Sequence, residues 1–303
     1  MYKRQVLAGD IFGASLLEHF NWVDYCVWGE GELPLLTLSK GLAHGTPFFE
    51  QDTPGLIYRK NSIIYNNEPQ EAPSLDDLPD PDYDDFFERI HRLHCNPMVQ
   101  ILIEGSRSCV HRCAFCNERH LSRKYRRKSS TRIVAMLRNL SIKYGCLNFL
   151  FTDSELPQKA IPELCTLIRA ENTDFHICAD IHADNPPINF EWLLRAGFNN
   201  VEIGIESLSQ SLLTKMNKKT RVIDNLHALK RCSELNLTFT WLLILGFPTE
   251  SQHDINELNR NMAFAKGFQP PMDISRFTLY KGSLVHENPA KYNLSLIHIS
   301  EPT

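Results

Sequence analysis

The chain has 303 residues, of which 43 % are hydrophobic and 22 % are charged, and its formal net charge is −4. This apolar content is enough for one large core or two domains, and the small net charge gives no indication of binding to nucleic acid or membrane surfaces. No apolar run reaches the about 18 residues of a membrane-spanning helix, and the apolar run after Lys3 and Arg4 is too short for a signal peptide. We therefore expect a cytoplasmic protein.

The range 1–66 mixes short apolar runs with glycines. The pattern predicts a strand at 6–8, a helix over 15–20, a strand over 23–29 and a second helix that begins at the acidic residues 30–32. This alternation predicts the last part of a doubly wound α/β domain.

The range 67–97 is predicted to be a surface linker. Within it, residues 68–88 contain nine Asp or Glu, four Pro and no Lys or Arg. Proline opposes helix formation and like charges repel one another. A solvated acidic loop between two domains is the expected structure.

From residue 98, apolar strands alternate with amphipathic helices. Strands are predicted at 98–105, 146–153, 174–184, 200–207, 237–248 and 272–282, and helices at 131–145, 157–171, 190–197, 222–236 and 254–267. Such alternation indicates parallel strands with right-handed crossovers. Six consecutive strands favour a partial (β/α)6 barrel over a small doubly wound sheet, so the range 98–294 is assigned to a barrel and 295–303 to a tail.

Chemistry in parallel barrels is located at the carboxyl ends of the strands. The first predicted strand is followed by three cysteines, Cys109, Cys113 and Cys116, in the spacing C-x3-C-x2-C. Polar or turn-forming residues lie at the ends of the next four strands: Asp153, Ser154, Glu155, Asp180, Gly204, Glu206, Ser207, Gly246, Pro248 and Glu250. We therefore expect the thiols and several acids to meet at one end of the barrel.

The three close cysteines have three candidate roles: free thiols, a zinc site completed by His111 or His120, or an iron–sulfur cluster. Structural zinc takes four ligands, often as two C-x2-C pairs, and only one such pair is present. A 4Fe-4S cluster usually takes four thiolates, so three would leave one iron open to an added ligand. We favour the iron–sulfur cluster over free thiols and over a zinc site. The remaining cysteines are expected to be buried thiols: Cys26, Cys95, Cys146, Cys165, Cys178 and Cys232.

With Phe115 before its third cysteine, the motif resembles that of the radical S-adenosylmethionine superfamily. The stretch "IEGSRSCVHRCAFC" (103–116) is similar to the family's first strand and cysteine loop, with Ser108 where a glycine is common. The stretch "LLRAGFNNVEIGIESLSQSLLTKMNKKT" (193–220) is similar to the region of the family's fourth strand. The resemblance covers roughly residues 98–280.

This resemblance implies a 4Fe-4S cluster on the three cysteines that cleaves S-adenosylmethionine reductively and yields a 5′-deoxyadenosyl radical. It implies these contacts with S-adenosylmethionine: Phe115, Asp153, Ser154, Glu155, Asp180, Glu206, Ser207, Gly246 and Pro248. Structural alternatives exist: Asp153 as a helix N-cap, Glu206 in an ion pair with a nearby cation, and Gly246 with Pro248 as a simple turn. A peptide or small-molecule substrate and an external electron donor are the expected partners.

The stretches "VDYCVWGEGE" and "LDDLPDPDYDDFF" resemble the branch that carries a cobalamin-binding domain, notably members that modify ribosomally made peptides. A domain of that kind needs about 100 residues or more, and the family's D-x-H-x-x-G loop is absent. The resemblance therefore implies cobalamin as a cofactor of a full-length parent and leaves open whether this part of the chain binds it. The ends 1–5 and 295–303 resemble translated adaptor sequence, and we expect them to be non-native.

The leading hypothesis is cobalamin-assisted C-methylation of a peptide or natural-product precursor. A radical oxidoreductase, cyclase or methylthiotransferase is the alternative within the superfamily. A zinc-binding or nucleic-acid-binding module that uses the seven Lys or Arg of the range 119–132 is the alternative of another class.

Overall fold

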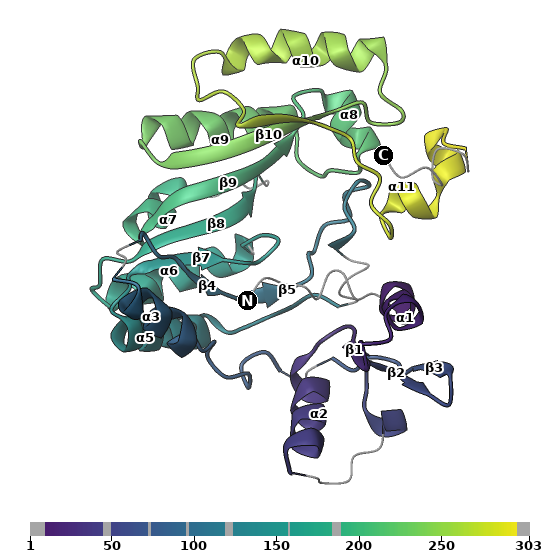
Figure 1. Ribbon diagram of the computed structural model, residues 1–303. Helices are drawn as coiled ribbons and strands as arrows, with labels where there is room; N and C mark the ends of the chain where they lie inside the picture. The colour runs from purple at the N-terminus through teal and green to yellow at the C-terminus, as the bar shows by residue number, and fades with distance from the viewer. Residues whose placement is uncertain are drawn as a thin grey trace. The chain divides into compact units, whose positions relative to one another are not determined.

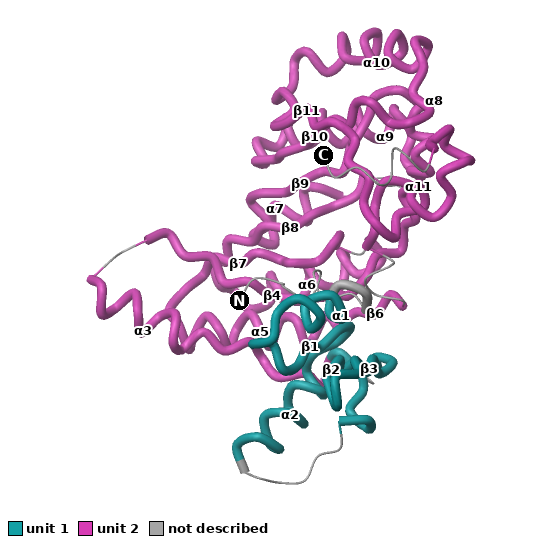
Figure 2. Tube along the Cα trace, turned by 45° about the vertical axis from the view of Figure 1, so that its right-hand side comes forward, with its two compact units in different colours: residues 1–75 teal, residues 76–303 magenta. Residues whose placement is uncertain are grey.

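The computed structural model describes residues 10–44, 50–71, 74–94, 97–118, 124–156, 158–183 and 189–295. It has two compact units, residues 1–75 and 76–303, which Figure 2 colours separately. The strand predicted at 6–8 and the ends expected to be non-native, 1–5 and 295–303, lie outside the described residues, apart from Ser295. In the described parts of the chain, no helix is both long and apolar enough to span a membrane.

The first unit contains α1 (Asp10–His19), β1 (Tyr25–Val27), α2 (Glu32–His44), β2 (Leu56–Lys60) and β3 (Ile63–Asn66). The helices at 15–20 and from 30–32 and the strand at 23–29 are confirmed as α1, α2 and β1.

The hairpin formed by β2 and β3 was not predicted. The order β1-β2-β3 is antiparallel throughout, which differs from the parallel pairing of a doubly wound domain. Its two-residue turn places Asn61 and Ser62 at φ +50° and +61°. Such turns are usually signalled by Asn-Gly or Asp-Gly, and Asn-Ser is a weaker signal.

The second unit contains a six-stranded parallel sheet in the order β11-β10-β9-β8-β7-β4. The strands are β4 (Ile101–Ile103), β7 (Asn148–Phe151), β8 (His176–His182), β9 (Phe198–Glu206), β10 (Thr238–Leu245) and β11 (Asp273–Arg276). Within this sheet, each strand pairs with the sheet strand that follows it along the chain. The predicted partial (β/α)6 barrel is therefore confirmed. A short antiparallel ribbon, β5 (Ser106–Arg107) with β6 (Arg126–Arg127), follows β4.

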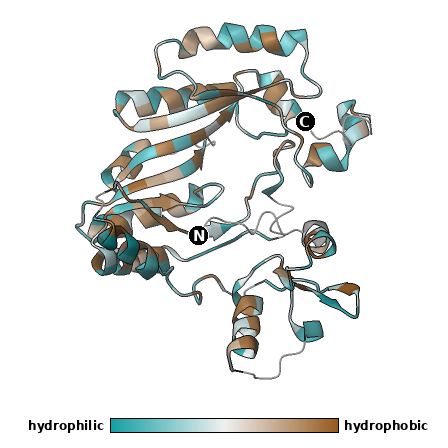
Figure 3. Ribbon diagram, in the orientation of Figure 1, coloured by the Kyte–Doolittle hydropathy of each residue, from teal (hydrophilic) through white to brown (hydrophobic). Residues whose placement is uncertain are grey.

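Helices cover one face of this curved sheet (Figure 1). They are α5 (Ser130–Tyr144), α6 (Ile161–Ala170) after the 3-10 turn η3 (Gln158–Ala160), α7 (Phe190–Arg195), α9 (Val222–Glu234) and α10 (Gln252–Ala265). Two short helices, α8 (Gln210–Lys215) and α11 (Leu284–Glu287), follow β9 and β11, and the 3-10 turn η4 (Pro289–Tyr292) follows α11. Figure 3 shows hydrophobic and hydrophilic residues on the same helices, as expected for helices with one buried face.

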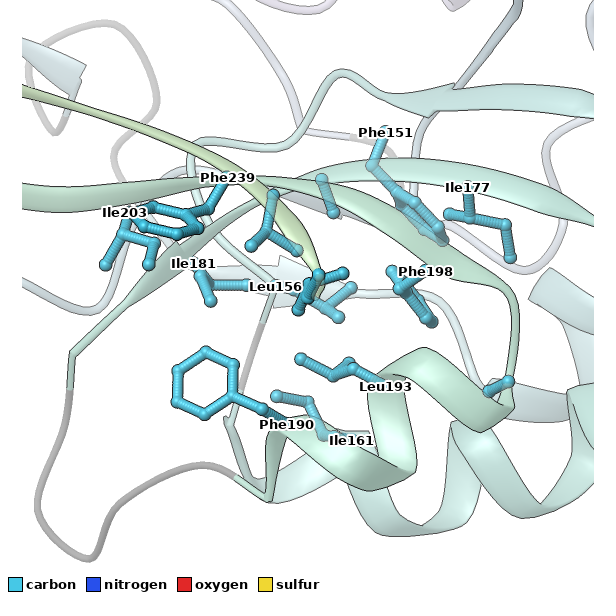
Figure 4. Close-up of a cluster of buried hydrophobic side chains, with 14 of the residues drawn as sticks. Phe151, Leu156, Ile161, Ile177, Ile181, Phe190, Leu193, Phe198, Ile203 and Phe239 are labelled. Atoms are coloured by element: carbon cyan, nitrogen blue, oxygen red, sulfur yellow. The ribbon is translucent and has the colours of Figure 1, made fainter. Parts of the chain in front are cut away.

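Burial alternates along the central strands, which separates the two faces of the sheet. In β8, residues 177, 179 and 181 are buried in the core, whereas 178 and 180 are only half-buried. Figure 4 shows Phe190 and Leu193 of α7 pointing toward side chains of the strands. The core therefore lies between sheet and helices, and the other face is left to carry polar side chains.

The acidic range 67–97 is not a free loop in its described part. It contains helix α3 (Asp84–Arg92). Asp80 forms an ion pair of 2.5 Å with Arg132, and the Asp76 carboxylate accepts a hydrogen bond of 2.8 Å from the Ser129 amide. The acidic residues therefore hold the start of α5. Of the basic range 119–132, Arg132 and the buried Lys128, which lies 3.6 Å from Glu104, form ion pairs within the protein.

We expect Gly197→Ala to destabilise the protein by about 2 kcal/mol, and Gly145→Ala by about 1 kcal/mol. Both glycines follow a helix and have positive φ, +89° and +62°. A Cβ at Gly197 would lie 2.3 Å from the Phe175 carbonyl oxygen, whereas a Cβ at Gly145 would meet nothing within 4 Å. Chemical unfolding of both variants measures the difference, and equal losses would contradict the predicted clash.

Candidate functional site

The three cysteines lie on the segment that follows β5, at the carboxyl end of the first barrel strand. Ser108 enters this segment with φ +66°, the left-handed conformation that glycine favours. Ser108 is buried, with 3 % of its surface exposed. The serine therefore adopts the turn for which a glycine is common in the family, and the predicted placement of the cysteine loop at a strand end is confirmed.

Burial dominates the environment of the thiols. It raises the pKa of Cys109 to about 12, with a further contribution from Glu155, and the pKa of Cys113 to about 11, against the opposing charge of Lys218. The pKa of Cys116 is raised mainly by burial as well. Because a metal binds the thiolate form, metal binding at this loop must displace the protons.

Backbone amides point at two of the sulfurs. The His111 amide donates to Cys109 Sγ at 3.4 Å, and the Glu118 amide donates to Cys116 Sγ at the same distance. Each thiol also interacts electrostatically with the others, since Cys109 is affected by both Cys113 and Cys116. Amide hydrogen bonds to sulfur are a feature that tunes iron–sulfur sites.

The donor set fits an iron–sulfur cluster better than a single zinc ion. Two thiolates on one zinc lie roughly 3.8 Å apart, given Zn–S bonds of about 2.3 Å. Among the described side chains, the three cysteines do not form a group whose ligand atoms all lie within 4.8 Å of one another. A polynuclear cluster places each thiolate on a different iron and separates the sulfurs further.

His111, between the first two cysteines, contacts the ends of two neighbouring strands. Its Nε2 lies 2.9 Å from Glu155 Oε2, and its ring stacks on His182, with centroids 3.9 Å apart and planes at 14°. The ligand atoms of these three residues lie within 4.8 Å of one another. An ion shared by His111 and His182 would have to lie in the planes of both imidazole rings. Because the two rings are stacked and nearly parallel, their planes do not intersect close to the ring nitrogens. This group therefore braces the cysteine loop against the ends of β7 and β8.

The strand-two residues differ in their surroundings. Asp153 is buried, and its Oδ2 accepts a hydrogen bond of 2.8 Å from the Gly105 amide next to the cysteine loop. Glu155 is buried against His111, whereas Ser154 is exposed. Helix α6 begins at Ile161, so the alternative that Asp153 caps this helix is wrong.

Of the two strand-four residues, Glu206 contacts a buried lysine, Lys218, that was not predicted. Glu206 accepts a hydrogen bond of 3.1 Å from Lys218 Nζ, which is the ion pair proposed as its structural alternative. Ser207 is buried, and its hydroxyl accepts from the Ser209 amide at 3.0 Å. Glu206 has φ +60°, which is uncommon for a residue other than glycine and is found often at functional sites.

The remaining predicted residues lie near the same strand ends. Gly246 has φ +75° and its amide donates to Glu250 Oε2 at 2.9 Å, so the turn before Pro248 is formed as expected. Phe115 packs with a small apolar cluster that contains Ala114 and Phe247. The structure thus places the predicted residues at one end of the barrel, while their contacts with S-adenosylmethionine remain predictions.

Asp180 lies on the half-buried face of β8, opposite Glu202 of β9. Burial raises its pKa to about 7, with added repulsion from Glu202 and Asp153. Its charged form is therefore disfavoured in the folded state, and this cost grows as pH rises from about 4 to about 7.

We expect Asp180→Asn to raise the free energy of unfolding by about 1–2 kcal/mol at about pH 8, and to have a smaller effect at about pH 5. Thermal unfolding at the two pH values measures this. The exposed Asp273, changed to Asn, is the matched control. An effect of Asp180→Asn that does not depend on pH would show that its charge is not the cause.

The supporting roles of three residues were not predicted from the sequence: His111, His182 and Lys218. His111 was considered only as a zinc ligand, and the other two come from different strands or turns. A contact between such distant residues becomes visible only in the folded chain.

The chain is similar in sequence to a known protein family and to several curated proteins. The sequence profile described as the Radical SAM superfamily matches residues 103–261. A protein of Pyrococcus horikoshii named as an uncharacterized methyltransferase is 26 % identical over 283 residues, which are 90 % of this chain and 60 % of the relative. An anaerobic magnesium-protoporphyrin IX monomethyl ester cyclase of Cereibacter sphaeroides is 24 % identical, covering 88 % of this chain and 44 % of the relative. The chain thus spans about half the length of these curated relatives.

Solved structures share the fold. The cobalamin-dependent S-adenosylmethionine radical enzyme OxsB, with aqua-cobalamin and S-adenosylmethionine bound, has a TM-score of 0.68 at 19 % identity, covering 92 % of this chain and 41 % of that one. The radical S-adenosylmethionine methyltransferase TsrM from Kitasatospora setae also has a TM-score of 0.68, at 18 % identity, covering 91 % and 57 %. The profile match spans more than half of the chain and includes the cysteine loop and the ends of β7 to β10. This chain belongs to the Radical SAM superfamily.

Proposed function

We propose that this chain binds a 4Fe-4S cluster through Cys109, Cys113 and Cys116 and cleaves S-adenosylmethionine reductively. The observation that carries the proposal is the cysteine loop itself: three thiols in the spacing C-x3-C-x2-C at the end of a parallel barrel, with amides directed at two sulfurs. When bound, such a cluster supplies the electron that breaks the sulfonium bond and so yields the 5′-deoxyadenosyl radical.

The residues of the chain hold and surround this group. His111, Glu155 and His182 brace the cysteine loop, and Asp153 fixes its start through the Gly105 amide. Buried acids at the same strand ends, with Glu206, offer acceptors for the amino group of S-adenosylmethionine. The protein thereby contributes position and the exclusion of water, while the cofactors supply the chemistry.

We extend the proposal to C-methylation of a peptide or small-molecule precursor, assisted by cobalamin in a full-length parent, with an external electron donor in the cytoplasm. Support comes from the name of the Pyrococcus horikoshii relative and from the fold shared with OxsB and TsrM. The cyclase names of other relatives favour radical cyclisation as the second candidate. S-adenosylmethionine with a deuterated methyl group separates the two, because only methylation transfers the label.

Anaerobic reconstitution with ferrous iron and sulfide tests the central proposal. We expect iron and acid-labile sulfide in the protein, and 5′-deoxyadenosine with methionine after addition of dithionite and S-adenosylmethionine. Bound zinc without iron, or a reconstituted cluster that yields no 5′-deoxyadenosine, would contradict it.

A further inference from the structure

The segment Met216–Lys218, which follows α8, holds the backbone of the cysteine loop. The Ala114 amide donates to the Met216 carbonyl at 2.7 Å, and Asn217 Nδ2 donates to the Arg112 carbonyl at 2.5 Å. These two contacts lie directly before and after Cys113. The Ala114 carbonyl, in turn, accepts from the Val285 amide of α11 at 3.1 Å. The loop is therefore anchored from the carboxyl side of the fourth strand, more than 100 residues along the chain.

Lys218 places a positive charge at the same point. Only 6 % of its surface is exposed, and its Nζ is 3.1 Å from Glu206 Oε1. A Cβ at Gly204 would lie 3.0 Å from this Nζ, so the glycine leaves room for the ammonium group. Lys218 acts electrostatically on both Cys113 and Cys116 and favours their thiolate forms, whereas Glu206 acts in the opposite sense on both.

Burying a lysine destabilises the folded state unless negative groups compensate its charge. Removing an ammonium group from water costs several kcal/mol. Burial acts to lower the pKa of Lys218, but Glu206, Cys113 and Glu155 outweigh it and raise this pKa. The partner Glu206 is itself held at φ +60°. A buried charge pair with a strained backbone, beside a set of metal-binding thiols, fits a functional role better than a contribution to stability.

We propose that Met216–Lys218 is a positioning element of the cluster site, in which Asn217 and Met216 fix the loop and Lys218 is the counter-charge of the cluster thiolates. This inference rests on the proposed function. Reduction of the cluster adds a negative charge, so a nearby cation stabilises the reduced state more than the oxidised state. Lys218 therefore makes the cluster easier to reduce.

The first test is the reduction potential of the reconstituted full chain, measured by EPR-monitored redox titration. We expect Lys218→Met to shift the equilibrium about tenfold toward the oxidised cluster, which is a potential about 59 mV lower for one electron. Lys218→Arg keeps the charge and should stay near the wild type. The exposed neighbour Lys219, changed to Met, is the matched control. A Lys218→Met potential equal to that of Lys219→Met would overturn the role of the charge.

The second test does not depend on whether the chain tolerates loss of the buried lysine. Asn217 and Asn236 both have φ +53°, and Asn236 is exposed. Glycine preserves this backbone conformation at either position. We expect Asn217→Gly to lose iron to a chelator about tenfold faster than Asn236→Gly, within the range known for supporting groups beside a metal. Equal rates would overturn the role of the clamp.

The outcomes of these experiments separate the proposed function from the role of Met216–Lys218. A wild-type chain that takes up no iron and sulfide contradicts both the proposed function and this inference. A cluster that forms and cleaves S-adenosylmethionine, with unchanged potential in Lys218→Met and unchanged iron loss in Asn217→Gly, contradicts this inference alone.

Discussion

Cys113→Ala is expected to abolish the formation of 5′-deoxyadenosine by the anaerobically reconstituted chain. With one of three thiolates removed, two irons of the cluster would lack a protein ligand, so iron and sulfide should no longer be retained. The loss should exceed the roughly 10–100-fold effect of removing a mere supporting group beside a metal. Chromatographic quantification of 5′-deoxyadenosine, with iron and sulfide analysis, measures it.

The control for this prediction is another buried cysteine. Cys165 of α6 is 2 % exposed and belongs to the core between sheet and helices. Cys165→Ala should keep both the cluster and the cleavage, because it removes a thiol that is not on the loop. If Cys113→Ala still forms 5′-deoxyadenosine at the rate of Cys165→Ala, the assignment of the cluster ligands is wrong.

Lys215→Met is expected to lower the free energy of unfolding by about 3–5 kcal/mol. Lys215 Nζ lies 2.5 Å from Asp254 Oδ2, and the side chain of Asp254 is fully buried. Burial acts to raise the pKa of Asp254, but hydrogen bonds from Lys215 and Ser251 outweigh it and hold this pKa well below its usual range. Loss of the lysine leaves a buried carboxylate whose remaining hydrogen-bond partners, Ser251 of the α10 cap and Ser211, carry no charge. Denaturant unfolding measures the change.

The pH dependence gives this prediction a second readout. A carboxyl whose pKa is lowered by folding contributes stability above its unfolded pKa of about 4, and the contribution is lost as pH falls through the folded value. The difference between wild type and Lys215→Met should therefore shrink below about pH 4. Lys219→Met, at an exposed lysine of the same turn region, should cost less than about 0.5 kcal/mol. Equal losses of unfolding free energy in Lys215→Met and Lys219→Met would show that the ion pair with Asp254 is not stabilising.

The sequence alone predicted the second unit in most of its elements. Its apolar runs and amphipathic helices alternate, and each run is long enough to identify, so the six strands and their crossovers followed from pattern and handedness. The cysteine loop was also predictable, because its ligands lie within eight residues of each other. Hydrophobic periodicity and the close spacing of ligands can both be identified from the sequence alone.

The first unit was predicted less well. Its strands are short and its hairpin turn uses Asn61 and Ser62 instead of a glycine turn, so the strands β2 and β3 were missed. The composition of residues 68–88 suggested a solvated loop, yet Asp80 pairs with Arg132 of a helix some fifty residues later. Charge composition describes repulsion within a segment and does not reveal opposite charges that folding brings to it.

Local periodicity and close spacing along the chain were enough to predict the superfamily fold, the three thiols and the strand ends at which they lie. The surroundings of the thiols were visible only in the folded chain: the brace of His111, Glu155 and His182, and the clamp of Asn217 with the charge of Lys218. These residues come from four separate parts of the barrel. Parallel strands bring their carboxyl ends to one edge of the sheet, so residues that no sequence motif connects become neighbours there.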